Sequence, residues 1–137
     1  MRACHTAAAV SATFDEPNLV SCAGLVPVLR LAERAGLPAA AQQRVRLPAC
    51  TGSAAANAGA KITSVVAGMV AGADSIDDLD VIRHGALPEL FGGIRAPSTL
   101  GTFLRGFTWG NVRQLDAVAR ETLTGLSRTA PLSVRIW

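Results

Sequence analysis

Hydrophobic residues recur along most of the chain at intervals of three and four, the spacing that places them on one face of an α-helix. The most continuous example is 62–70, where isoleucine, valine and methionine form a stripe and the remaining positions are mostly small residues. Such a segment is apolar nearly all round, so we expect it to lie in the centre of the core. More amphipathic patterns predict further helices at 21–36, 38–45, 98–107 and 111–126.

Helix-end signals add two short helices to this list. Ser75 followed by Asp78 resembles a capping box, acidic residues fill the next turn, and Gly85 ends the segment. A single helical turn is expected at 87–91, before a Gly-Gly pair. The other side chains expected to cap a helix N-terminus are Ser21 and either Ser98 or Thr99.

The predicted helices at 98–107 and 111–126 each have one apolar side that we expect to face the core. In the first, this side consists of Leu100, Phe103, Leu104 and Phe107. In the second, it consists of Val112, Leu115, Val118, Ala119, Leu123 and Leu126.

Composition supports an all-α fold in a single domain. The chain has 137 residues, half of them hydrophobic, yet only 4% are aromatic and tyrosine is absent. Strands are enriched in aromatic and β-branched residues, so this alanine-rich composition favours helices. We predict a small domain of about five to six helices over 19–128, preceded by a tail at 1–18 and followed by a tail at 129–137.

The net charge of +3 is unevenly distributed. Residues 1–73 carry a net +3, residues 74–94 carry −4, and residues 95–137 carry +4. An acidic segment between two basic ones is typical of a protein that orients an anionic partner, although solvated helix faces explain the charges equally well.

Several classes of site and location are disfavoured. Cys4, Cys22 and Cys50 are an odd number without C-x-x-C spacing, and His5 and His84 lie far apart, so neither a disulfide framework nor a zinc site is predicted. The longest uncharged apolar run, 62–73, is shorter than the ~20 residues of a membrane span, and the N-terminus lacks a signal-peptide core. We expect a cytoplasmic protein with no membrane partner.

The aspartate-rich segment allows two interpretations, metal binding and helix capping. Asp74, Asp77, Asp78 and Asp80 do not follow the spacing of a calcium loop, and successive helical positions point in different directions. Capping is the better interpretation, and no metal ligand is assigned. The chain also lacks a nucleophile elbow, a phosphate loop and a dinucleotide fingerprint, so no catalytic residue is assigned.

Three short helices in succession, with a glycine-containing turn before the third, outline a helix-turn-helix. Hydroxyl and arginine side chains on the outer side of the third helix have the chemistry to contact phosphates and base edges. An ordinary amphipathic core helix is the alternative. The candidate DNA-binding residues are Arg95, Ser98, Thr99, Thr102, Arg105 and Arg113.

Three longer runs carry a family resemblance. They are FDEPNLVSCAGLVPVLRLAERAGL at 14–37, SVVAGMVAGADSIDDLDVIRHG at 64–85 and LFGGIRAPSTLGTFLRGFTWGNVRQLDAV at 90–118. Together they resemble the N-terminal region of bacterial insertion-sequence transposases of the DDE type, in the IS-thirteen-eighty group. The resemblance implies a role in DNA transposition, with the ends of an insertion sequence as the DNA partner. Full-length members use magnesium held by three acidic residues to cut and join DNA strands.

The resemblance does not extend to the catalytic residues. In the family the first catalytic aspartate follows soon after the position of Pro131, whereas here no acidic residue follows Glu121. We therefore expect a truncated fragment that binds no cofactor of its own and cannot cut DNA. Gly101 and Thr102 stand where wider relatives often have serine and arginine, which weakens the expectation of base-specific contacts.

Two other functional readings remain open at the level of sequence. In the first, the chain is a helical interaction module without direct DNA contact. Gly68 and Gly72 would then mediate self-association or docking to a full-length transposase. Tight packing within the chain is the alternative role of these glycines. In the second, the chain is a poorly folded pseudogene remnant with exposed apolar residues at 134–137.

Overall fold

The computed structural model describes residues 20–47 and 56–129, and these residues form helices and connecting turns without a β-strand. The prediction of a small all-α domain is confirmed. The two predicted tails lie almost entirely outside the described residues. The α-helices are α1 (Leu25–Arg34), α2 (Leu37–Arg44), α3 (Ala58–Val70), α4 (Leu87–Leu90), α5 (Pro97–Arg105) and α6 (Val112–Thr129), and two 3-10 helices are η3 (Asp77–Arg83) and η4 (Trp109–Asn111).

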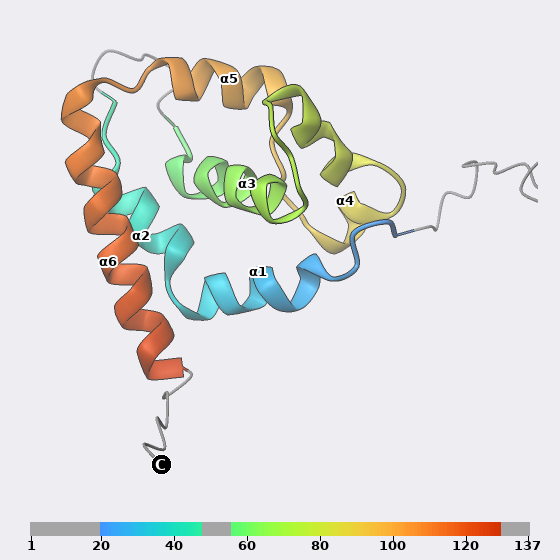
Figure 1. The fold of residues 1–137 in the computed structure, drawn as a ribbon, viewed down its shortest axis with the longest axis horizontal. Helices are drawn as coiled ribbons and strands as arrows, with labels where there is room; N and C mark the ends of the chain where they lie inside the picture. The colour runs from blue at the N-terminus through green and yellow to red at the C-terminus, as the bar shows by residue number, and fades with distance from the viewer. Residues whose placement is uncertain (1–19, 48–55, 130–137) are drawn as a thin grey trace, which may run out of the picture.

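The elements surround α3, which lies in the middle of the view in Figure 1. Helix α1 runs below it and α5 above it, while the long helix α6 descends along one side from the end of α5. Helix α2 packs against both α3 and α6. This arrangement leaves the outer sides of α5 and α6 facing away from α3, so these two helices form much of one rim of the domain.

Two groups of buried apolar side chains hold the helices together. The larger includes Phe103 from α5 and Val118 from α6, and it joins these helices to α2. Its other buried members are Leu37, Ala40, Ala41, Val45, Leu47 and Ala58. The smaller group consists of Leu25, Leu29, Ala67 and Ile82, which join α1 to α3 and η3.

Gly68 serves packing within the chain. A Cβ atom added at this position would overlap the Leu79 side chain of η3. Gly68 itself is buried, and Gly72 adopts a left-handed conformation with φ of 92° just beyond the end of α3. The structure therefore gives Gly68 the tight packing within the chain that the alternative interpretation expects, and it places Gly72 at a helix end.

The predicted hydrogen-bond exchange between Ser75 and Asp78 is present, although the helix that follows begins at Asp77, with Ile76 as its N-cap. The Ser75 backbone N–H and hydroxyl donate to Asp78 Oδ2 at 2.9 and 2.7 Å, and the Asp78 N–H donates back to the Ser75 oxygen at 3.3 Å. These hydrogen bonds stabilise the charged carboxylate and lower the pKa of Asp78 below its ordinary value. The segment that follows is a 3-10 helix rather than the expected ordinary helix.

The other two predicted caps are wrong. Helix α1 begins after Gly24 without a side-chain cap, and the Ser21 hydroxyl donates to Cys22 Sγ. Helix α5 begins after Ala96, without a side-chain cap, because Pro97 occupies its first turn. Proline needs no hydrogen-bond partner for its nitrogen, so one unsatisfied donor of the helix end is already removed.

The predicted core side of α6 is wrong in part. Val118 is buried, but the side chains of Val112, Leu115 and Leu123 are 44%, 38% and 63% exposed, and Ala119 is also exposed. The side that faces the core instead carries Asn111, Val118 and Gly125. Gly125 lies against the Ala35 backbone at the end of α1. Helix α6 is rotated from the orientation that its apolar pattern alone predicts, and an apolar stripe is left on its outer surface.

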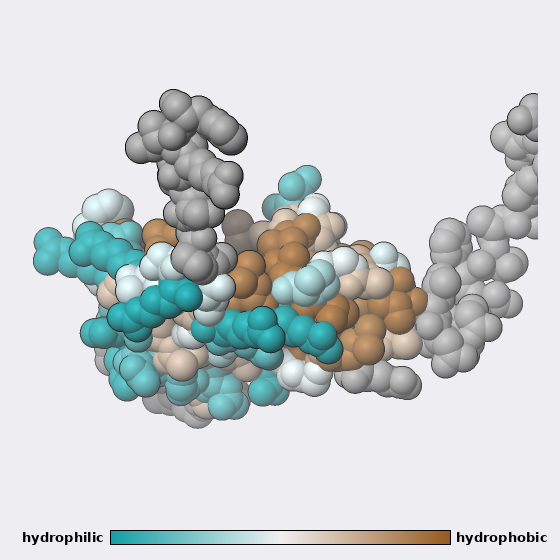
Figure 2. Space-filling view, turned by 90° about the horizontal axis from the view of Figure 1, so that it is seen from below, coloured by the Kyte–Doolittle hydropathy of each residue, from teal (hydrophilic) through white to brown (hydrophobic). Residues whose placement is uncertain are grey.

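Among the described residues, no helix is both long and apolar enough to cross a membrane. The polar and apolar side chains are nevertheless segregated on the surface. Seen from the side of α1, hydrophilic residues gather on the half of the molecule towards α6, and hydrophobic residues gather on the other half (Figure 2).

Candidate nucleic-acid interface

The predicted DNA-binding residues occupy three different environments along α5 and the start of α6. Arg95 precedes α5 and is half-buried. Its backbone N–H donates to Ser64 Oγ of α3 at 3.1 Å, and its Nε atom is buried without a hydrogen-bond partner among the described residues. Arg95 therefore anchors the start of α5 to α3, and its Nε cannot reach a ligand in solvent.

Ser98, Thr102 and Arg105 form one exposed row on α5, because their spacing of four and three residues places them on the same helix face. The Thr102 hydroxyl donates to the Ser98 carbonyl at 3.0 Å, and Arg105 Nη2 donates to Thr102 Oγ1 at 3.4 Å. Thr99 lies beside this row and is half-buried. The structure thus brings three of the six candidate residues together.

The threonine in this row has little freedom to recognise a base. Its hydroxyl hydrogen is already donated within α5, and its oxygen accepts from Arg105. The arginine retains most of its five donors, which suit phosphate oxygens. The row is therefore better suited to phosphate contact than to reading base edges.

Arg113 lies on the first turn of α6, eight residues beyond Arg105 in the sequence. It lines a surface hollow together with Trp109, Gly110 and Val112. Trp109 is 89% exposed, the largest exposure among the bulky apolar residues of the described chain. We call the segment from Arg105 to Arg113 the α5–α6 corner.

The α5–α6 corner is held in place by Asn111, which is 4% exposed. Its Oδ1 accepts from the Thr108 N–H and hydroxyl at 2.8 and 2.9 Å, which closes a capping box around η4. Its Nδ2 donates to the Arg46 carbonyl at 2.9 Å and to Gln114 Oε1 at 3.1 Å. Gln114 Oε1 also accepts from the Arg46 N–H. The corner is therefore bonded to the segment that follows α2.

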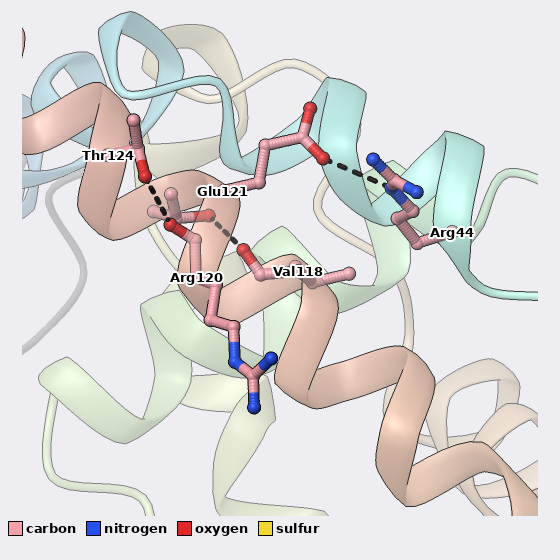
Figure 3. Close-up of polar contacts among 6 residues, drawn as sticks. Arg44, Val118, Arg120, Glu121 and Thr124 are labelled. Carbon is pink, nitrogen blue, oxygen red and sulfur yellow. Dashed lines mark hydrogen bonds and ion pairs between the residues drawn. The ribbon is translucent and has the colours of Figure 1, made fainter.

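The arginines of the interface have no carboxylate partner within 20–47 and 56–129. The ion pairs found there join Arg44 to Glu121 (Figure 3) and join Asp80 to Arg83 and His84. Arg95, Arg105 and Arg113 take part in none of them. An unpaired arginine on the surface keeps its full charge available to an anion.

The acidic segment lies close to one side of α5. Helix η3 packs against α5, and the Ile76 side chain lies near Gly101. Asp77, Asp78 and Asp80 would repel a polyanion from this side. An anionic ligand therefore has its most favourable approach at the far end of α5, where Arg105 and Arg113 lie.

Trp109 and Asn111 were missed by the sequence analysis. The pattern Thr108-x-x-Asn111 is a detectable capping signal, whereas no local pattern indicates that Trp109 is exposed. The apolar pattern of 111–126 assigns this helix to the core and so conceals the role of Asn111. No group of three or more potential metal-ligating side chains lies together in the described part of the chain.

Comparison with known proteins finds no matching family model, curated protein or solved structure.

Proposed function

We propose that this protein binds DNA through the α5–α6 corner and the adjacent row on α5, as the DNA-contacting N-terminal region of an insertion-sequence transposase. The observation that carries the proposal is the pair of exposed arginines, Arg105 and Arg113, at the adjoining ends of two helices with no carboxylate partner in the described chain. The resemblance of the runs at 14–37, 64–85 and 90–118 supplies the transposase context.

The proposed contact is mainly to the phosphate backbone. Guanidinium groups offer planar donors that match phosphate oxygens, and such contacts contribute binding energy that is independent of base sequence. The hydroxyl of Thr102 positions Arg105 and leaves few donors for base edges. We therefore expect modest affinity with steep salt dependence and little discrimination between duplex sequences.

Replacing Arg105 with alanine is expected to weaken binding to a duplex about fivefold at low salt, because one phosphate contact is lost. The same change should reduce the slope of log affinity against log salt concentration by about 0.9. Fluorescence anisotropy titrations of a labelled duplex at several salt concentrations measure both quantities. Arg113→Ala should give a similar loss.

Arg30→Ala is the matched control for this titration. Arg30 is also an exposed arginine, but it lies on α1, on the opposite side of α3 from α5 (Figure 1). It should change duplex affinity less than twofold. Equal losses from Arg30→Ala and Arg105→Ala would show that net charge alone drives binding, and no binding at low salt would refute the DNA-binding proposal.

The outer stripe of α6 favours a second candidate function, self-association. Val112, Leu115, Ala119 and Leu123 are exposed along one side of an 18-residue helix. At the upper end of this stripe, Leu115 also lines an apolar groove with Val66 of α3, Leu104 of α5 and Phe107, which follows α5. The exposed Leu123 of a second copy is of suitable size to enter this groove.

Charge complementarity favours a second copy of the chain as the occupant. Asp116 and Arg120 flank the stripe, and neither takes part in an ion pair within the described residues. Figure 3 shows the Arg120 side chain directed away from the Arg44–Glu121 pair. If two α6 helices pack antiparallel with their centre between these residues, Asp116 of each copy meets Arg120 of the other, twice in one symmetric interface.

Charge exchange tests this arrangement. Asp116→Arg should convert a dimer into a monomer at tens of micromolar protein, because like charges then face each other, and adding Arg120→Asp should restore the dimer. Leu123→Asp should also give the monomer, while Leu90→Asp, at another exposed leucine on α4, should leave the dimer intact. Sedimentation velocity measures these states, and a wild-type protein that is monomeric at this concentration would exclude the self-association candidate.

A further inference from the structure

We infer that Trp109 is a stacking platform for an unpaired nucleobase, so that the protein recognises DNA with a single-stranded or opened end as well as the duplex backbone. This inference deepens the proposed DNA-binding function and rests on it. It assigns a role to the most exposed bulky apolar side chain of the described structure, which the duplex contacts of Arg105 and Arg113 do not use.

The exposure of Trp109 is imposed by the local fold. At 89% exposure, its ring gains almost nothing from burial, which is costly for the largest apolar side chain. The turn that displays it is nevertheless locked, because Asn111 is buried and bonds to Thr108, Gln114 and the Arg46 carbonyl. A rigid turn loses little conformational entropy when a ligand binds, so the ring is presented ready for contact.

The surroundings of Trp109 select the kind of ligand. Arg113 lines the same surface hollow, and Arg105 lies four residues before the tryptophan. Four residues of chain span at most about 14 Å, so both arginines lie within reach of the phosphates on either side of a base stacked on the indole. An aromatic platform between cationic groups is the arrangement by which proteins hold single-stranded nucleic acid.

An apolar protein partner fits the corner less well. Such a partner would bury the uncompensated charges of two arginines beside the indole, which costs free energy unless the partner supplies carboxylates in register. A base with its flanking phosphates satisfies the ring and both charges at once. Every base has an aromatic face, so this contact is expected to tolerate any base.

The test uses the intrinsic fluorescence of Trp109. The chain has two tryptophans, so Trp137→Phe leaves Trp109 as the single fluorophore. Titration of this variant with a twelve-residue oligothymidine at low salt should quench its emission by at least about half, because stacking brings the base into contact with the indole. In the wild-type sequence, Trp109→Leu should weaken the binding of oligothymidine about tenfold. The same change should weaken the binding of a blunt-ended duplex less than twofold.

Two further variants separate stacking from a general surface effect. Trp109→Phe keeps an aromatic face and should recover most of the affinity for oligothymidine. Leu90→Ala removes an exposed apolar side chain on α4 and should leave that affinity unchanged. Because the Trp109 and Leu90 side chains are exposed, the variants at these two positions should retain the wild-type circular dichroism spectrum and melting temperature.

The outcomes distinguish this inference from the proposed function. Duplex binding that depends on Arg105, with no quenching by oligothymidine, would overturn the stacking role and leave the proposed function standing. Quenching of Trp109 by oligothymidine, together with weaker oligothymidine binding by Trp109→Leu and no duplex binding, would support the stacking role and overturn the duplex proposal. A Trp109 emission change that depends on protein concentration alone would place the residue in a protein contact and overturn the inference.

Discussion

Gly125→Ala is expected to destabilise the domain by about 2–3 kcal/mol, the cost of overpacking a close contact. A Cβ atom at this position of α6 would overlap the backbone carbonyl of Ala35 at the end of α1. Ala35 is buried, and the next residue, Gly36, has a left-handed conformation with φ of 82°. The obstructing atoms therefore belong to a constrained backbone turn and cannot move aside as a flexible side chain can.

The direction of this effect makes the test decisive. Within an isolated helix, alanine is more stable than glycine by about 1 kcal/mol, so local propensity alone predicts a gain in stability. Urea denaturation with a circular dichroism signal measures the free energy of unfolding. Gly24→Ala is the control, because Gly24 has an ordinary helical φ of −61° and no atom within 4 Å of the added Cβ. A more stable Gly125→Ala protein would mean that α6 does not cross α1 as the structure shows.

Phe103→Ala is expected to cost about 3–5 kcal/mol, the usual range for removing a buried aromatic ring. Phe103 is 0% exposed and is the residue of α5 that joins the larger core group with α2 and α6. Its ring meets that of Phe107 edge-on, with centroids 5.1 Å apart, and Lys61 Nζ lies 5.2 Å from its centroid. Truncation would leave a cavity and remove both aromatic interactions.

A loss of this size is a large part of the total stability of a small domain, which is about 5–15 kcal/mol. Thermal denaturation and urea titration should both show the change. Phe103→Leu retains most of the buried volume and should lose clearly less than Phe103→Ala. A loss below about 1 kcal/mol for the alanine variant would indicate that α5 is not packed on this core, and the placement of the candidate interface on α5 would then be wrong.

The positions of most helices could be predicted from the sequence because their signals are local. The apolar stripe at 62–70 lies within α3, Pro38 lies in the first turn of α2, and Gly92-Gly93 follows α4. The capping exchange between Ser75 and Asp78 involves residues three apart, so their identities are enough to indicate it. None of these features depends on which helix packs against which.

The candidate interface could be predicted only in part. Helical periodicity places Thr102 and Arg105 on the outer side of α5, and both side chains are exposed. Ser98 completes this row in the structure, whereas Thr99 is half-buried. The anchoring of Arg95 depends on Ser64, which is 31 residues away, and was not visible in the local pattern. The role of Trp109 depends on the burial of Asn111 and its hydrogen bond to the Arg46 carbonyl, which fix the turn that exposes the ring.

The sequence by itself determined that this protein is helical, where the helices begin and end to within a few residues, and that its basic residues concentrate beyond residue 94. Only the tertiary structure decided which side of α6 is buried. That choice follows from contacts between distant segments, the approach of Gly125 to Ala35 and the Asn111 hydrogen bond to Arg46 across 65 residues. These contacts outweigh the helix's own apolar pattern, since a close backbone approach and a buried amide each admit one orientation, whereas an apolar stripe tolerates partial exposure.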